Sequence, residues 1–93
     1  MKEILYFYLS GNSQCSKADR IIRNVVERFP EFREVKIKKI EKDLQKDIAC
    51  MFDFTTVPCF FVNGIKIFEG NASIEKVSEA FKLALISDKQ NEN

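Results

Sequence analysis

The chain has 93 residues, of which 45% are hydrophobic and 31% charged, which suits a single domain with one core and excludes a largely disordered protein. Fifteen basic and fourteen acidic residues leave a formal charge of +1, and no run of like charge forms the basic stripe expected of a nucleic-acid-binding protein. Because there is no His and the three cysteines are widely spaced, neither imidazole catalysis nor a metal site is expected.

Residues 4–9 form an apolar, β-rich run, which predicts a strand buried on both faces in the middle of a sheet. The run is too short to span a membrane, and no small-residue cleavage site follows it. The odd number of cysteines also argues against a secreted disulfide scaffold. We therefore expect a cytoplasmic protein that binds neither membranes nor nucleic acid.

The segment after this strand predicts a helix and then an edge strand. The chain breaks at residues 10–13, and the apolar residues that follow have the i, i+3, i+4 spacing of a helix with one buried stripe: Ala18, Ile21, Ile22, Val25, Val26 and Phe29. Pro30 ends this helix. Residues 34–38 alternate polar and apolar side chains, as in a strand exposed on one face. Two strands joined through a helix form a parallel βαβ unit.

The second half of the chain predicts a short helix, a β-hairpin and a final helix. Four apolar residues mark the short helix after its expected N-cap residue Asp43: Leu44, Ile48, Met51 and Phe52. Asn63 and Gly64, between two β-rich segments, supply the positive φ angles that a two-residue hairpin turn requires. Ser73 is expected to cap the final helix, and the polar residues 87–93 are expected to form a flexible tail.

The expected order is βαβαββα, an α/β fold with a four-stranded mixed sheet and helices on both faces, in a single domain over residues 1–86. Three motifs occur in order along it. Residues 10–18 read Ser-Gly-Asn-Ser-Gln-Cys-Ser-Lys-Ala, residues 56–58 read Thr-Val-Pro, and residues 60–64 read Phe-Phe-Val-Asn-Gly, with Phe-Glu-Gly at 68–70. In these motifs the chain resembles the thioredoxin and glutaredoxin families, and the resemblance implies the thioredoxin fold.

In these families the loop after the first strand carries two cysteines in a Cys-x-x-Cys motif. Alignment on the strand and on Lys17-Ala18 places Cys15 at the second cysteine and Asn12 at the first, so the nucleophilic thiol is missing. Asn12 or Ser13 is then expected to cap the helix, because both residue types are preferred N-caps. In a second register, Cys15 is instead the first, exposed cysteine and acts alone as a monothiol that forms mixed disulfides.

The resemblance also implies roles for the residues around Pro58, whose peptide bond is cis in the family and faces the active-site loop. Thr56 and Val57 would bind substrate, because the Val57 backbone can pair with an extended segment of a partner. Cys59 would lie close to the loop, and it could resolve a mixed disulfide with Cys15 only if the Cα atoms of the two residues come within about 7 Å of each other. The alternative for Cys59 is a small buried strand residue.

Two functions follow from these observations, in either case for a monomer. The first is a thiol–disulfide redox role toward protein or peptide partners, with Cys15 as the sole thiol of a degenerate active site. The alternative is a redox-inactive thioredoxin-fold module that binds a partner in the groove beside Pro58. Glutathione is only a weak candidate, because Val57 alone matches the glutathione site of glutaredoxins. No other cofactor is expected, and Cys50 is expected to pack rather than react.

Overall fold

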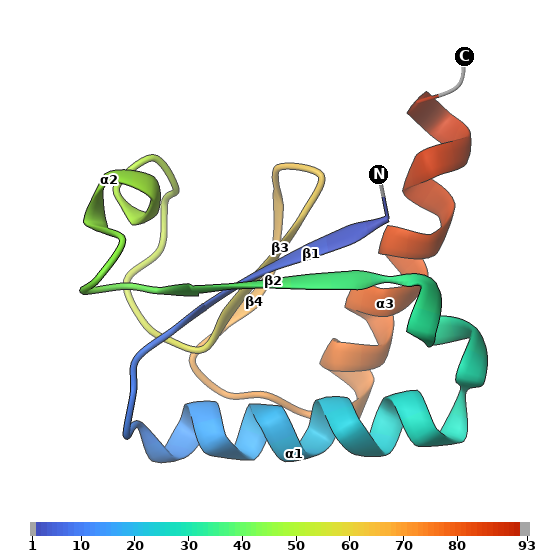
Figure 1. Ribbon diagram of the computed structural model, residues 1–93, viewed down its shortest axis with the longest axis horizontal. Helices are drawn as coiled ribbons and strands as arrows, with labels where there is room; N and C mark the ends of the chain where they lie inside the picture. The colour runs from blue at the N-terminus through green and yellow to red at the C-terminus, as the bar shows by residue number, and fades with distance from the viewer. Residues whose placement is uncertain (1, 92–93) are drawn as a thin grey trace.

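Eight helices and strands follow one another in the computed structural model, which describes residues 2–91 (Figure 1). In chain order they are β1 (Glu3–Tyr8), α1 (Ser13–Arg28), the 3₁₀ helix η1 (Pro30–Glu34), β2 (Lys36–Glu41), α2 (Lys46–Ala49), β3 (Cys59–Val62), β4 (Ile65–Glu69) and α3 (Ile74–Asn91). The predicted order βαβαββα is confirmed, with η1 as an added turn between α1 and β2.

The four strands form one mixed sheet in the order β2-β1-β3-β4. Strand β1 runs parallel to β2 and antiparallel to β3, and β3 pairs antiparallel with β4. The hairpin between β3 and β4 turns at Asn63 and Gly64, whose φ angles of 55° and 83° are the positive values that this turn needs. The predicted hairpin, the central position of β1 and the edge position of β2 are therefore confirmed.

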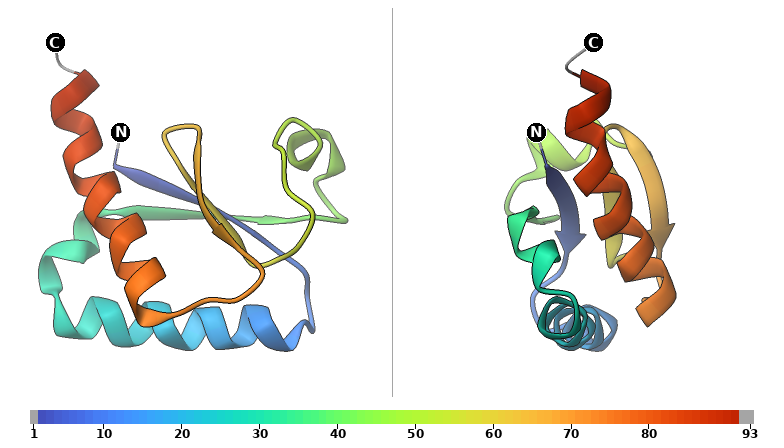
Figure 2. Two further views of the ribbon diagram at one scale, coloured as in Figure 1. Left: turned by 180° about the vertical axis from the view of Figure 1, so that it is seen from behind. Right: turned by 90° about the vertical axis from the view of Figure 1, so that its right-hand side faces the viewer.

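Side chains of β1 alternate between the two faces of the sheet and enter two separate apolar clusters. Ile4 and Tyr6 pack with α1, η1 and α3 on one face, whereas Phe7 packs on the other face with α2 and the segment after it. Figure 1 and Figure 2 show α1 and α2 on opposite sides of the strands. Helix α2 is short, so aromatic rings complete this cover: the ring centroid of Phe7 lies 5.0 Å from that of Phe52 and 4.7 Å from that of Phe54.

The long helices begin and end close to the predicted positions. Helix α1 ends at Arg28, but Phe29 leaves the buried stripe and is exposed, because its backbone has already left the helical conformation (φ −128°, ψ 84°). Helix α3 is capped by Ser73, whose Oγ accepts the backbone N–H of Lys76 at 3.1 Å. Residues 87–91, predicted to belong to the tail, continue this helix, and the last two residues lie outside the described part.

Helix α2 differs most from the prediction, because it has only four residues and its N-cap residue is Gln45 rather than Asp43. The cause lies in Glu41, whose carboxylate accepts the backbone N–H groups of Asp43 at 2.6 Å and Leu44 at 3.3 Å. These amides are held in a turn at the end of β2, so the helix begins later. Leu44 therefore lies before the helix, whereas Met51 lies beyond its end at Ala49, and the two residues are 81% and 74% exposed.

Candidate functional site

Asn12 is the N-cap residue of α1 and closes the loop that follows β1. Its backbone is extended (φ −80°, ψ 126°), and its side-chain Oδ1 accepts the backbone N–H of Cys15 at 3.0 Å. The backbone N–H of Asn12 in turn donates to the carbonyl of Leu9 at 3.3 Å. This cap satisfies one of the N–H groups that every helix N-terminus leaves free. Of the two residues predicted as caps, Asn12 rather than Ser13 fills the position.

Cys15 lies in the first turn of α1 and belongs to the apolar cluster on the α2 side of the sheet, with only 3% of the residue exposed. Its carbonyl accepts the Tyr6 hydroxyl at 2.9 Å. Burial raises the pKa of the Cys15 thiol, although a hydrogen bond with the Leu9 backbone and the charge of Lys39 act in the opposite direction. The thiol is therefore protonated and shielded near neutral pH, and it lacks the exposure that the second register requires.

Cys59, the first residue of β3, is fully buried in the same apolar cluster as Cys15 and Val57. Burial, together with the negative charge of Glu69, raises the pKa of the Cys59 thiol to about 12. Both thiols are free. The fold thus brings Cys15 and Cys59 into one cluster but exposes neither, which is the environment expected of small buried core residues.

Cys50 is exposed, whereas the sequence predicted that it would pack. It follows the short helix α2, and its Sγ donates to the carbonyl of Asp47 at 3.3 Å. Within residues 2–91, no group of three or more His, Cys, Asp or Glu side chains is placed to hold a metal ion. None of the helices in this part of the chain has both the length and the apolar composition needed to cross a membrane.

Residues 55–58 form the segment that leads into β3. The Val57–Pro58 peptide bond is cis, and the Pro58 carbonyl accepts the N–H of Gly70 at 2.8 Å, which ties the segment to the end of β4. Val57 is buried as a whole residue, with 8% of it exposed, and none of the described residues exchanges a hydrogen bond with its backbone N–H or C=O. Val57 therefore carries an unpaired backbone donor and acceptor beside the sheet.

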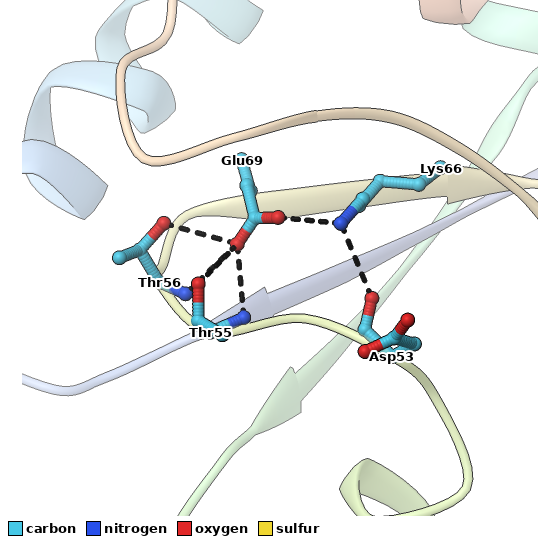
Figure 3. Close-up of polar contacts among 5 residues, drawn as sticks. All are labelled: Asp53, Thr55, Thr56, Lys66 and Glu69. Atoms are coloured by element: carbon cyan, nitrogen blue, oxygen red, sulfur yellow. Dashed lines mark hydrogen bonds and ion pairs between the residues drawn. The ribbon is translucent and has the colours of Figure 1, made fainter.

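Glu69, the last residue of β4, binds this segment through its carboxylate (Figure 3). Its Oε2 accepts the backbone N–H groups of Thr55 and Thr56, each at 2.9 Å, and their hydroxyls at 3.2 and 3.1 Å. Its Oε1 accepts from the ammonium of Lys66, which also donates to the carbonyl of Asp53 at 3.3 Å. Lys66 and the two amides hold the pKa of Glu69 well below its usual range, so the carboxylate stays ionised near neutral pH.

Two residues of this site were not identified from the sequence. Tyr6 lies within an apolar run, and the sequence pattern does not indicate that its hydroxyl donates a hydrogen bond to the carbonyl of Cys15. Glu69 belongs to the Phe-Glu-Gly motif, but its contact with Thr55 and Thr56 depends on how the hairpin returns to the preceding loop. The signal that could have found it is an acidic residue at the end of a strand, with two consecutive threonines available to donate.

Comparison with known proteins places this geometry in a known fold. No family model and no curated protein matches the sequence. The solved structure of thioredoxin 1 from the thermophilic eubacterium Thermosipho africanus is similar, with a TM-score of 0.65 and 21% sequence identity over 94% of this chain and 98% of that one. The chain has the thioredoxin fold.

A second solved structure, described as that of a malarial protein, has the same TM-score of 0.65 with 15% identity, over 89% of this chain and 96% of that one. Both similarities extend over almost the whole of each chain, so the fold predicted from the motifs is confirmed as a whole and not only in its central strands. At these identities the likeness concerns the fold, and the function has to be argued from the site.

Proposed function

We propose that this domain is a thioredoxin-fold binding module that holds an extended segment of a partner protein against the Val57 backbone and performs no disulfide exchange of its own. The observation that carries the proposal is the burial of Cys15, the sole thiol of the loop, in an apolar cluster. The start of α1, where a reactive thiol would be activated, is occupied by the neutral cap Asn12.

Thiol–disulfide exchange begins when a thiolate attacks a disulfide sulfur, so its rate depends on the thiolate fraction and on access to the sulfur. Cys15 lacks both, because it is almost completely buried and burial raises its pKa. Cys59 is fully buried and has a pKa raised to about 12. Near neutral pH, neither thiol is suited to attack a disulfide of a partner protein.

The binding surface of this proposal is made of backbone rather than of thiols. Val57 has an N–H and a C=O without a partner among the described residues, and the preceding Thr55 and Thr56 are exposed. An extended polypeptide can pair with such a residue by strand addition, in which main-chain hydrogen bonds supply the affinity. The class of ligand is therefore an extended polypeptide segment, bound without any covalent step.

The proposal is tested by a nuclear magnetic resonance titration of the isotope-labelled domain with reduced, carboxymethylated lactalbumin, an unfolded protein without free thiols. We expect saturable shifts centred on the Val57 amide, with the same affinity in the Cys15→Ala variant, because no thiol takes part. A titration without saturable shifts, or with shifts confined to another face of the domain, would contradict the proposal.

A second candidate is thiol–disulfide exchange through Cys15, with protein or peptide disulfides as substrates. It is favoured by the position of Cys15 in the first turn of α1, where the helix N-terminus and the charge of Lys39 favour a thiolate. The Asn12→Cys variant tests the alignment of the loop: if Asn12 occupies the place of the first family cysteine, the variant gains reduction of a test disulfide, and no gain points to the register in which Cys15 is the first cysteine. Reduction by the wild-type chain itself would favour exchange over simple binding.

A further inference from the structure

Glu69 connects two parts of the fold that are distant in sequence, the end of β4 and the segment before Pro58 (Figure 3). Four hydrogen bonds from the consecutive residues Thr55 and Thr56 converge on its Oε2 atom. Its other oxygen is held by Lys66. Because both carboxylate oxygens are engaged, the side chain cannot turn away without breaking several charge-assisted hydrogen bonds.

These contacts fix the residues that come directly before Val57. The N–H groups of Thr55 and Thr56 are used within the domain, so Val57 is the residue of this segment whose backbone N–H remains unpaired among the described residues. Lys66 also binds the carbonyl of Asp53, so the chain two residues before the segment is anchored as well. A segment outside any helix or strand would otherwise have to be ordered by its partner, which weakens binding.

We infer that Glu69 is the positioning residue that pre-organises residues 55–57 for an extended partner, an inference that rests on the proposed function. In this role Glu69 acts through the two amides that it holds, while Val57 makes the pairing contacts. The entropy cost of ordering the segment is met when the domain folds and not when the partner binds. The lowered pKa of Glu69 agrees with this role, because the carboxylate keeps the charge on which its hydrogen bonds depend.

The test compares variants of Glu69 in binding carboxymethylated lactalbumin and in amide exchange. Glu69→Ala removes every contact of the carboxylate, so we expect the dissociation constant to rise about tenfold and the Thr55 and Thr56 amides to exchange faster. Glu69→Gln keeps an oxygen that can accept both amides but loses the charge that pairs with Lys66, so its affinity should be intermediate. Glu79→Ala, which removes an exposed carboxylate from α3, is the matched control and should bind like the wild-type chain.

A purely structural role of Glu69 would lower the stability of the domain without changing the affinity of the folded fraction. A folded Glu69→Ala variant with wild-type affinity would therefore overturn this inference and leave the proposed function intact. Failure of the wild-type chain to bind would instead overturn the proposed function, and unchanged exchange of the Thr55 and Thr56 amides in the variant would overturn the anchoring itself. If Glu69→Ala does not fold, wild-type affinity in Glu69→Gln counts against the inference in the same way.

Discussion

Asn12 and Cys15 show how one side chain changes the chemistry of a helix start. The Oδ1 atom of Asn12 accepts a hydrogen bond from the backbone N–H of Cys15. This N–H is therefore bound to a neutral side chain and is not free to stabilise an anion at the start of α1. The cap could be predicted from the sequence, because it depends on residue type and on local spacing alone. The contact between Tyr6 and the Cys15 carbonyl could not, because it depends on how β1 packs against α1.

The cap makes a direct prediction about stability. Asn12→Ala removes the acceptor of the Cys15 amide and should lower the free energy of unfolding by about 1 kcal/mol, measured by guanidinium denaturation. Ser13→Ala is the matched control, because Ser13 is already inside the helix and the cap of Asn12 remains. Equal losses in the two variants would show that the side chain of Asn12 is not the cap that holds α1.

The elements differ in how well the sequence predicted them, because apolar patterns predict helices and strands but not the hydrogen bonds that single side chains make to the backbone. Helices α1 and α3 have long apolar stripes, and each was predicted close to its observed start or end. Helix α2 was predicted too long, because the pattern could not reveal that the side chain of Glu41 binds the amides of Asp43 and Leu44. The hydrogen bonds from Thr55 and Thr56 to Glu69 were not predicted for a different reason, because these partners are 14 and 13 residues away from Glu69 in sequence.

Helix α3 should depend on one aromatic contact more than on its other apolar residues. Phe81 is completely buried, and its ring stacks on that of Phe32 from η1, with centroids 5.0 Å apart. Phe81→Ala should therefore lower the free energy of unfolding by about 3–5 kcal/mol, as large cavities in cores do. Leu83→Ala, at an exposed site on the same helix, should change it by about 0.5 kcal/mol or less. Similar losses from both variants in denaturant unfolding would refute this account of the docking of α3.

The whole molecule consists of a sheet that separates two apolar clusters, and both buried thiols belong to the one beneath α2. The three sequence motifs predicted the fold itself, because they mark turns and strand ends that lie in a fixed order along the chain. Which cysteines share a cluster could not be predicted in this way. Cys15 from α1 and Cys59 from β3 belong to one cluster because the fold packs both residues into it, although they are 44 positions apart in the sequence.

The burial of the Cys59 thiol and the Tyr6 hydroxyl predicts that the folded domain becomes less stable at alkaline pH. The pKa of Cys59 is raised from 9.0 to about 12 in the folded state, and the pKa of Tyr6 is raised as well. The contribution of each group to the free energy of unfolding is fully present below the pKa that the group has in the unfolded chain. It is lost as the pH rises from that value through the higher pKa of the folded state, because in this range the unfolded chain has released the proton and the folded chain has not. The loss reaches at most about 1.4 kcal/mol per pH unit for each group.

Denaturant unfolding between neutral pH and pH values above 9.0 measures this effect. The wild-type chain should lose stability steadily over the alkaline part of the range, and the Cys59→Ala variant should lose it less steeply, because one of the groups is gone. A flat profile, or an identical slope in the variant, would mean that the Cys59 thiol is not buried in the folded state.

The most direct test of the whole account is the pH dependence of Cys15 alkylation in the folded chain, with Cys50 and Cys59 both replaced by Ala. If the domain binds without disulfide exchange, the Cys15 thiol should be alkylated slowly at neutral pH, and the pH dependence of the rate should give an apparent pKa for Cys15 above the ordinary thiol value of 9.0. Fast alkylation with an apparent pKa well below about 8.5 would reveal an accessible thiolate and would contradict the account.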